Sequence, residues 1–467
     1  ADFSKACTEA GIVFIGPSSE AIEIMGNKAA SKRRMLAAGV PCIPGYQDEG
    51  QSDAALQAAA AEIGVPIMVK AAAGGGGRGL RLVESLDELA AARAAARSEA
   101  ENAFGSGELI LEKAVLRPRH VEIQVFGDEH GNVIHLGERD CSVQRRHQKV
   151  VEEAPCPVMT DALREAMGTA AVSAAKSINY VGAGTVEFLL DADNNFYFLE
   201  MNTRLQVEHP VTEMITGQDL VAMQLRVAHG YPLPLTQRDV VLNGHAIEVR
   251  LYAEDPVNDF LPATGIANVW LPAQGEGVRV DHGLAEGQAV SPFYDPMVAK
   301  VIAWGEDRSI ARRRLVRALE GTALLGLPNN REFLLDVLRQ PDFIEGRATT
   351  AFIADHYSAQ PPAAPEASKQ HLALAACLLY RQARRESRAV AVSALPTMDG
   401  YTGARALRNR YRFGPVEQAI DVLVEELAPG EFQVQVGDQL LSLQWVDEHS
   451  SSVRVRLDGV QLTARYC

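Results

Sequence analysis

The sequence predicts an α+β enzyme followed by a small antiparallel β domain. Up to about His356 the chain alternates apolar strand-like runs, helical stretches and glycine-containing loops, as α/β and α+β enzymes do. After Phe413 it changes to short alternating strands, with turns at Gly437-Asp438 and Asp458-Gly459. These two patterns predict the fold class.

Composition narrows the class of protein. A length of 467 residues allows two to four domains, and 47% hydrophobic and 22% charged residues are ordinary globular values. The formal net charge of −15 argues against nucleic acid or an anionic membrane surface as a partner. No apolar run is long enough to span a bilayer, and no secretory signal opens the chain. Six cysteines without CxxC spacing argue against a zinc site and a disulfide scaffold, so we expect a cytoplasmic protein, or one of the mitochondrial matrix if the source is eukaryotic.

The most informative segment, residues 182–213, has the pattern of a β-hairpin. An apolar run leads into an Asp- and Asn-rich turn, and a second apolar run follows it. If the loop consists of Asp193 and Asn194, Glu187 on the first strand pairs directly with Glu200 on the second. The pattern therefore predicts two carboxylates side by side on adjacent strands.

Polar side chains alternate along the second strand and beyond it. Since strand side chains alternate faces, we expect one face to carry Glu200, Asn202, Arg204, Gln206 and Glu208. The carboxylates of Glu187 and Glu200, with the amide of Asn202, form an all-oxygen site suited to Mg²⁺. The alternative is a solvated polar face of an antiparallel sheet. We favour a site, because the flanking strands are apolar and the polar set mixes both signs of charge with amides.

A glycine-rich loop joins two strand-like runs around residues 67–83 and contains Gly74, Gly75, Gly76 and Gly77. Glycine lets a backbone close over phosphates and donate its N–H groups to them. No Gly-Lys-Ser/Thr follows, and the loop runs into a strand, so it is neither a Walker loop nor a Rossmann fingerprint. We expect a flap over a nucleotide, with a ligand-free flexible loop as the alternative. The next helix begins at a capping box of Ser85 and Glu88.

Charged residues beside this loop favour a nucleotide. Lys70 directly precedes it, and Glu112 and Lys113 end the apolar run Leu109–Leu111. A lysine pairs with phosphate oxygens, and groups at a strand edge can recognise the adenine amino group.

Residues 137–153 are dense in Arg, His and Lys although the chain is acidic. Such a concentration indicates an anionic small ligand in a focused positive field. The alternative is a solvent-facing lattice of salt bridges with Glu152 and Glu153. Cys141 lies in this stretch without a histidine placed for a dyad, so we interpret it as a small packed thiol.

A break in organisation follows His356. Ser358–Pro365 reads as a linker, and a helix is expected from Glu366 to about Glu386. The four alternating strands that follow are expected at Phe432–Val436, Leu440–Val446, Val453–Leu457 and Val460–Ala464. They predict a small barrel or curled sheet without a catalytic constellation, whose expected role is to hold parts of an assembly together.

Taken together, the motifs of residues 1 to about 356 resemble the biotin carboxylase component of biotin-dependent carboxylases, which has an ATP-grasp fold. The stretches that carry the resemblance are Gly26–Lys28, Lys70 with the glycine loop, Leu111–Lys113, Arg119–Gln124, Glu138–Pro155, Glu200–Glu213 and Gly244–Arg250. More loosely, residues 366–467 resemble the helix-plus-barrel domain that docks the carboxyltransferase subunit in propionyl-, methylcrotonyl- and geranyl-CoA carboxylases.

The resemblance implies roles for the matching residues. ATP would be contacted by the glycine loop and by Lys28, Lys70, Glu112, Lys113, His120, Gln144 and His147. Mg²⁺, or Mn²⁺, would be held by Glu187, Glu200 and Asn202. Bicarbonate would be held by Lys149, Arg204, Gln206 and Val207. Glu208 would deprotonate it, and Arg250 would stabilise the enolate of biotin. For Arg250 taken singly, a structural salt bridge with Glu248 or Glu254 is the alternative.

The resemblance also implies a domain order and partners. The expected divisions are residues 1–40 (remnant of the N-terminal biotin carboxylase subdomain), 41–115 (ATP-grasp lid), 116–356 (C-terminal biotin carboxylase subdomain), 357–365 (linker) and 366–467 (docking domain). The expected partners are a carboxyltransferase β subunit and a biotinyl carrier domain within a large α/β hetero-oligomer, with no nucleic acid and no membrane.

Three departures from the family pattern bear on these expectations. The chain starts at Ala1 and reads directly into a helix and a strand expected at Ile12–Ile15, so most of the family's N-terminal nucleotide fold is expected to be absent. No Met-Lys-Met tripeptide occurs, so biotin would be carried on a domain outside this chain. Leu261–Gly265 has alanine at Ala263 where serine is expected, a change we cannot interpret.

Three functions are compatible with the motifs. The first is ATP-dependent carboxylation of biotin for an acyl-CoA carboxylase, with methylcrotonyl- or geranyl-CoA favoured over propionyl-CoA. The second is another ATP-grasp ligase that forms carboxyphosphate; the string Arg204–Pro210 followed by the Arg250 motif favours biotin. The third is a non-catalytic docking subunit, which a loss of Glu200 or Glu208 would have supported; both are present.

Overall fold

The computed structural model describes residues 1–48, 50–72, 79–359, 362–363, 366–392 and 407–467, without the side chains of Phe104 and Val416. The glycines predicted to cover a nucleotide, Gly74–Gly77, lie outside these residues. None of the described helices is long and apolar enough to cross a membrane. All six cysteines are free thiols.

Three helices open the chain: α1 (Asp2–Glu9), α2 (Ser19–Gly26) and α3 (Lys28–Ala37). The side chains of Ser18 and Asn27 accept hydrogen bonds from the first-turn N–H groups of α2 and α3. The prediction of a strand at Ile12–Ile15 is wrong. This segment pairs with no described strand, and Ile12 and Val13 are 61% and 63% exposed. An apolar run without a hydrogen-bonding neighbour does not form a strand.

A small α/β unit follows. Its four-stranded sheet has the order β1 (Gly45–Tyr46), β4 (Leu109–Lys113), β2 (Ile67–Ala71) and β3 (Leu80–Val83), all neighbours antiparallel. The helices of this unit are α4 (Asp53–Ile63) and α5 (Leu89–Phe104). The prediction that the glycine loop joins two strands and precedes a helix is confirmed, since β2 and β3 flank it. Ser85 accepts a hydrogen bond from Asp87 N–H just before α5.

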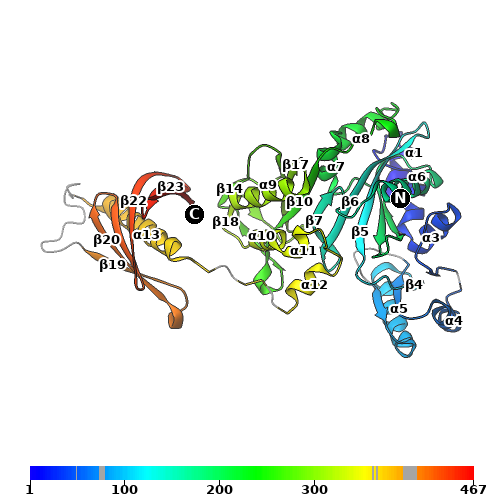
Figure 1. Cartoon of the computed structure of the whole chain (residues 1–467), viewed down its shortest axis with the longest axis horizontal. Helices are drawn as coiled ribbons and strands as arrows, with labels where there is room; N and C mark the ends of the chain where they lie inside the picture. Colours follow the sequence, from blue (N-terminus) through cyan, green and yellow to red (C-terminus); the bar gives the residue numbers. More distant parts are fainter. Residues whose placement is uncertain (49, 73–78, 360–361, 364–365, 393–406) are drawn as a thin grey trace.

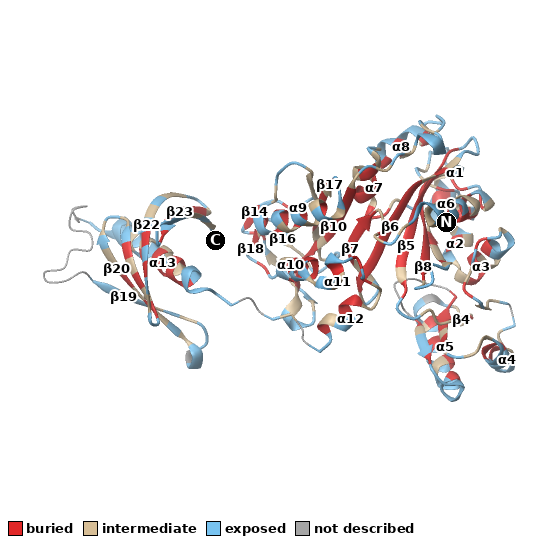
Figure 2. Ribbon diagram, viewed as in Figure 1, coloured by how far each residue is buried: buried red, intermediate tan, exposed pale blue. Residues whose placement is uncertain are grey.

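An eight-stranded antiparallel sheet is the largest sheet of the described residues (Figure 1). Its order is β15 (Val278–His282), β17 (Met297–Gly305), β10 (His245–Tyr252), β7 (Gln148–Ala154), β6 (Val133–Arg145), β5 (Arg119–Gly127), β8 (Gly182–Leu190) and β9 (Phe196–Asn202). Its central strands are buried along most of their length (Figure 2).

Helices cover the sheet, and the two faces of the sheet differ in character: one packs against α6 and is mainly apolar, and the other carries charged side chains. The helices in order are α6 (Asp161–Ser177), α7 (His209–Thr216), α8 (Leu220–Ala228), α9 (Arg308–Gly321), α10 (Arg331–Arg339), α11 (Pro341–Ile344) and α12 (Phe352–Tyr357). On β5, Val121, Ile123 and Val125 share a core with α6, and the residues between them point to the opposite face. That opposite face carries the charged side chains described below.

Three short two-stranded sheets complete this part of the chain. They are β11 (Glu254–Asp255) with β12 (Leu261–Pro262), β13 (Gly265–Ile266) with β16 (Ala289–Val290), and β14 (Val269–Leu271) with β18 (Ala323–Leu325).

The predicted β8–β9 hairpin is confirmed, but its loop differs from the prediction. Asp191 and Asn195 close a three-residue loop in which Asn194 has φ 63°. The longer loop shifts the pairing by one residue near the turn, and a bulge opposite Glu187 restores it. Glu187 therefore pairs with Glu200 as expected, although not for the expected reason.

The C-terminal part has its own core. It consists of α13 (Lys369–Val390) and a six-stranded meander of β19 (Arg408–Phe413), β20 (Ile420–Ala428), β21 (Glu431–Val436), β22 (Gln439–His449), β23 (Ser452–Leu457) and β24 (Val460–Arg465). The four predicted strands are confirmed; β19 and β20 were not predicted. Within the described residues β24 does not pair with β19, so the sheet is open rather than a barrel.

Candidate active site

A row of charged side chains crosses four strands on the face opposite α6. The cross-strand partners are Arg139 on β6, Glu122 on β5, Glu187 on β8 and Glu200 on β9. Direct partners in antiparallel strands point to the same side, so this register brings one guanidinium and three carboxylates together. Glu187 and Glu200 were predicted from the sequence; Glu122 and Arg139 were not.

Lys149 on β7 lies at the centre of these carboxylates. Its Nζ is 2.5 Å from Glu122 Oε2, 3.0 Å from Glu187 Oε1 and 2.5 Å from Glu208 Oε1. Burial lowers the pKa of Lys149, but Glu122 and Glu187 outweigh it and hold that pKa well above its usual value. The ammonium is therefore charged, and from β7 it contacts carboxylates on β5, on β8 and at the start of α7.

Glu208 bridges two cations. One carboxylate oxygen contacts Lys149, and the other lies 3.0 Å from Nη2 of Arg250 on β10. Arg250 also donates through Nε to Glu152 Oε1 at 2.6 Å. Glu208 is 2% exposed and occupies the N-cap position of α7. The alternative of Glu248 or Glu254 as the salt-bridge partner of Arg250 is not what the structure shows; Glu152 and Glu208 are its partners.

Residues 203–208 are a loop between β9 and α7, so the prediction of one continuous polar strand face is wrong. The carbonyl of Gln206 accepts from His209 Nδ1 at 2.7 Å and that of Val207 from Lys300 Nζ at 2.7 Å, which replaces strand pairing. The chain then enters α7, which has Pro210 in its first turn.

The loop separates residues that were predicted to act together. Gln206 and Glu208 are buried, whereas Arg204 is exposed and donates only to the neighbouring Leu205 carbonyl at 3.4 Å. One orientation of the Gln206 amide lets Nε2 donate to Glu208 Oε1 at 3.1 Å and Oε1 accept from Asn202 at 2.8 Å.

The residues present fit a divalent cation. Glu187 and Glu200 supply carboxylates from paired strands, and Asn202, whose Nδ2 donates to Glu187 Oε1 at 2.8 Å, adds an amide. Burial and the neighbouring Glu187 raise the pKa of Glu200. A cation would relieve this repulsion between like charges. A second set of close ligand atoms, within 4.8 Å of one another, comes from His120, Glu122 and Glu187.

Basic side chains predicted to contact ATP lie on two sides of this row. On β2, Lys70 Nζ is 2.5 Å from Glu112 Oε2, and Lys32 holds the other oxygen at 2.7 Å. Lys28 Nζ lies 3.8 Å from Glu200. Lys113 does not share this arrangement, because its Nζ donates to the carbonyls of Gly64 and Val65.

His120 links the nucleotide side to the carboxylates. Its Nδ1 lies 2.6 Å from Gln144 Nε2, and its Nε2 lies 2.9 Å from Glu187 Oε2. Burial lowers the pKa of His120, but the Glu187 carboxylate raises it above the usual value. His147 lies at the tip of the β6–β7 hairpin, where it and Arg146 have φ of 66° and 50°.

Of the two buried site residues that the sequence analysis did not predict, Glu122 and Arg139, only Glu122 has a recognisable sequence signal. On β5, His120, Glu122 and Gln124 alternate with valine and isoleucine, which marks a polar face turned inward. Arg139 has no such signal, because its position in the charged row follows only from its cross-strand pairing with Glu122. Cys141, predicted to be a packed thiol, is fully buried, and burial raises its pKa well above the usual value.

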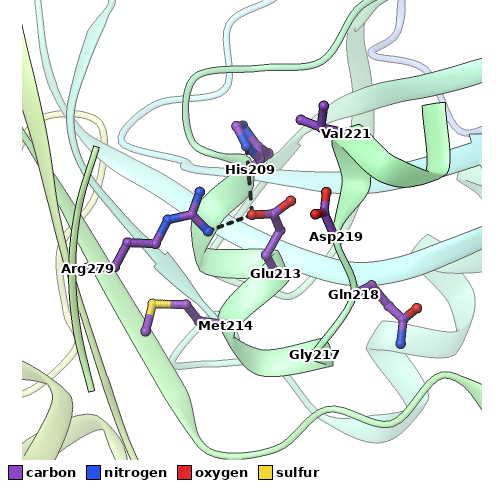
Figure 3. Close-up of a pocket in the computed structure, with 8 residues that line it drawn as sticks. All are labelled: His209, Glu213, Met214, Gly217, Gln218, Asp219, Val221 and Arg279. Atoms are coloured by element: carbon purple, nitrogen blue, oxygen red, sulfur yellow. Dashed lines mark hydrogen bonds and ion pairs between the residues drawn. The ribbon is translucent and has the colours of Figure 1, made fainter. Parts of the chain in front are cut away.

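A cavity of about 430 Å³ is lined by residues of α7, by the turn that follows it and by Arg279 on β15 (Figure 3). Glu213 reaches into it, 2.6 Å from Arg279 and 3.9 Å from His209. None of the predicted site residues lines it.

Comparison with known proteins identifies the family. The model "Carbamoyl-phosphate synthase L chain, ATP binding domain" matches residues 27–236, and "Biotin carboxylase C-terminal domain" matches residues 248–355. The biotin carboxylase of Nostoc sp. is 51% identical over 76% of this chain and 79% of its own length. The chain belongs to the biotin carboxylase family.

The family resemblance extends to solved structures and to larger relatives. The biotin carboxylase domain of Hydrogenobacter thermophilus 2-oxoglutarate carboxylase, solved with MgADP, ADP and bicarbonate, has a TM-score of 0.74 at 46% identity, over 76% of this chain and 78% of that chain. This confirms the ATP-grasp fold. The methylcrotonoyl-CoA carboxylase α subunit of Dictyostelium discoideum is 48% identical over 92% of this chain, and the alignment spans 62% of that relative. The mouse subunit is 49% identical over 80% of this chain, and the alignment spans 52% of that relative.

Proposed function

We propose that the protein carboxylates biotin at the expense of ATP and bicarbonate, as the first half-reaction of an acyl-CoA carboxylase. The observation that carries this proposal is the position of Glu208, whose two carboxylate oxygens contact Lys149 and Arg250. A buried base between two cations is placed to take a proton from an anion that both cations attract.

Activation of bicarbonate would use the nucleotide side of the row. Phosphoryl transfer depends on positioning and charge neutralisation, which Lys70, Lys28 and His120 can supply around the phosphates. Glu187, Glu200 and Asn202 would hold Mg²⁺, which neutralises phosphate charge when bound.

Bicarbonate would lie next to Lys149. Glu208 accepts its proton, and the resulting nucleophile attacks the γ-phosphate of ATP, which forms carboxyphosphate and releases ADP. Gln206 and the Val207 backbone border the same space, held by the contacts of the 203–208 loop. Arg204 enters this role only if its exposed side chain turns inward when substrates bind.

Carboxyphosphate can release CO₂ and phosphate, phosphate can then take the N1 proton of biotin, and the deprotonated N1 attacks CO₂ to form carboxybiotin. The ureido oxygen gains negative charge when N1 loses its proton. Arg250, 11% exposed and held by Glu152 and Glu208, is the fixed cation that would stabilise that charge.

The acyl-CoA substrate proposed for the whole protein is methylcrotonyl-CoA, supported by the names of the α subunits that align with 80% or more of this chain. The proposed partners are a carboxyltransferase β subunit, docked through residues 366–467, and a biotinyl carrier domain. The relatives from Dictyostelium and mouse are named mitochondrial, so a matrix location is proposed for a eukaryotic source.

The test is ATP hydrolysis by the full-length protein with Mg²⁺ and bicarbonate, with and without free biotin. We expect bicarbonate-dependent hydrolysis that biotin stimulates and that Glu208→Gln lowers by about 10²-fold or more. Hydrolysis indifferent to biotin would instead support another carboxyphosphate-forming ligase. No hydrolysis by the folded protein would support the docking role alone.

A further inference from the structure

Arg139 on β6 is a fully buried arginine behind the proposed bicarbonate site. Its side chain is 0% exposed, and it is the largest of the described side chains that are fully buried. Its donors are spread over several elements: Nε to Glu122 Oε1 at 2.6 Å, Nη1 to Gln124 Oε1 at 2.8 Å and Thr212 Oγ1 at 2.9 Å, and Nη2 to Thr185 Oγ1 at 3.1 Å.

One branch of these contacts leads to Lys149. Glu122 gives one carboxylate oxygen to Arg139 Nε and the other to Lys149 Nζ, at 2.6 and 2.5 Å. Glu122 is itself fully buried, so its direction is set by these two cations. The place of Lys149 relative to Glu208 and Glu187 therefore depends on a carboxylate that Arg139 orients.

A second branch leads to Glu208. Thr212 lies on α7 four residues after Glu208, which is the N-cap of that helix. Residues four apart lie on the same side of a helix, so the Thr212 contact ties the Glu208 side of α7 to the sheet. Arg139 thus connects to Lys149 through Glu122 and to Glu208 through Thr212. In one orientation of the Gln206 amide, Arg139 Nη2 also donates directly to Gln206 Oε1 at 3.4 Å.

Packing alone does not explain an arginine here. A buried ion pair is often no more stabilising than well-packed apolar side chains, because both charges lose hydration. The planar guanidinium, however, directs several donors at fixed angles, which neither lysine nor an apolar side chain can do. Arg308 gives a structural counterpart: it also forks onto a buried carboxylate, Glu153, but its other acceptors are main-chain carbonyls of Phe343 and Ile344.

We infer that Arg139 is a positioning residue for bicarbonate, which aligns Lys149 through Glu122 and Glu208 through Thr212 on α7. The inference rests on the proposed function. The inference predicts that Arg139 affects the binding of bicarbonate and not the binding of ATP, because neither branch passes through Lys70, Lys28 or Glu112.

The test compares Arg139→Lys with wild type in the full-length protein, by steady-state bicarbonate-dependent ATP hydrolysis. Lysine keeps the charge and loses the fork. We expect the KM for bicarbonate to rise about tenfold or more while the KM for ATP stays within about twofold, since small displacements of aligned groups cost large factors. The matched control is Arg308→Lys, which removes the same kind of fork and is expected to lower the Tm without changing the KM for bicarbonate.

Thr212→Val separates positioning from folding. The substitution is close to isosteric and removes only the hydroxyl that accepts from Nη1. We expect a bicarbonate KM about threefold higher, an unchanged ATP KM and a cooperative melt. A double variant adds a further check: if Arg139 acts through Glu122, Arg139→Lys should raise the bicarbonate KM less in a Glu122→Gln background than in wild type.

The outcomes distinguish this inference from the proposed function. If wild type shows no bicarbonate-dependent hydrolysis, the proposed function fails. If wild type is active and Arg139→Lys keeps the wild-type KM for bicarbonate, or raises both KM values equally, the positioning role is overturned. If Arg139→Lys does not fold, Thr212→Val decides, and an unchanged KM for bicarbonate there overturns the inference.

Discussion

At the scale of single residues, the site is a set of buried charges that neutralise one another. Lys149 contacts three carboxylates, and Glu208 is shared between Lys149 and Arg250. Such an arrangement is costly to bury without complete pairing, and removing one member leaves an unpaired charge. The carboxylate substitutions below are therefore Glu→Gln, which conserves shape and changes only charge.

The carboxylate on the edge strand should govern the need for metal. Glu200→Gln removes one of two paired carboxylates and keeps the β8–β9 register, so we expect the Mg²⁺ concentration for half-maximal ATP hydrolysis to rise about tenfold or more. The control is Glu425→Gln, which changes a carboxylate on the C-terminal sheet. An unchanged Mg²⁺ dependence in Glu200→Gln would remove this residue from the metal site.

Glu112 should make the small α/β unit sensitive to acid. Burial raises the pKa of Glu112, but Lys70 and Lys32 outweigh it and hold that pKa below its ordinary value of 4.5. A carboxyl whose native pKa is depressed stabilises the fold above its unfolded pKa, and this stabilisation is lost as the pH falls below about 4.5. We expect Glu112→Gln to lower the Tm at pH 7. The difference in Tm from wild type should shrink progressively as the pH falls below about 4.5. A difference in Tm that is constant with pH would contradict this account of the charge cluster.

At the scale of elements, the hairpin β8–β9 shows what sequence patterns can predict. Apolar runs and the Asp/Asn turn were sufficient to predict both strands, whereas the predicted pairing of Glu187 with Glu200 holds only because a bulge compensates for the longer loop. The loop length and the bulge were not predictable from this pattern. The loop is one residue longer than predicted, the bulge adds one residue to β9, and the two shifts in register cancel, so the same pair results. Glu122 could have been found from the polar alternation on β5, whereas Arg139 becomes evident only once β5 and β6 are paired.

The segment after β9 shows why alternation alone is insufficient. Polar residues two apart suggested a strand from Glu200 to Glu208, but carbonyls in this stretch find partners in the side chains of His209 and Lys300. Lys300 is 93 residues away from Val207 in the sequence, so no local pattern reveals its contact. The same limit applies to Ile12–Ile15, which has strand composition and no described partner.

The β6–β7 turn allows fold and function to be separated. Arg146 and His147 both have positive φ, which costs most residues about 1 kcal/mol or more and costs asparagine less. Arg146→Asn should keep or raise the Tm and leave the KM for ATP unchanged, because among the described residues the Arg146 side chain pairs only with exposed Asp259. His147→Asn should also keep the Tm but raise the KM for ATP several-fold. Equal effects of both substitutions on that KM would exclude a nucleotide contact by His147.

At the scale of the whole molecule, the charged row and the C-terminal sheet belong to different cores. The C-terminal core is formed by α13 and the meander and contains none of the proposed site residues. Phe432 lies at its centre, 2% exposed, with rings of Tyr380 and Trp445 at 5.8 and 6.3 Å.

This separation predicts that association and catalysis can be uncoupled. Phe432→Ala should cost the C-terminal core about 3–5 kcal/mol and abolish co-purification with the proposed carboxyltransferase partner, while bicarbonate-dependent ATP hydrolysis persists. Leu440→Ala, at a position 57% exposed on the same sheet, is the control and should change neither. Loss of ATP hydrolysis in Phe432→Ala, with the remainder of the protein folded, would show that the two parts depend on each other.

The most direct test of the central claim is transfer of label from radioactive bicarbonate to free biotin by the full-length protein. The account predicts acid-labile labelled carboxybiotin that requires ATP and Mg²⁺, is absent with Glu208→Gln, and is formed in proportion to the biotin-stimulated ATP hydrolysis. ATP hydrolysis without any labelled carboxybiotin, from protein that folds and binds ATP, would contradict it.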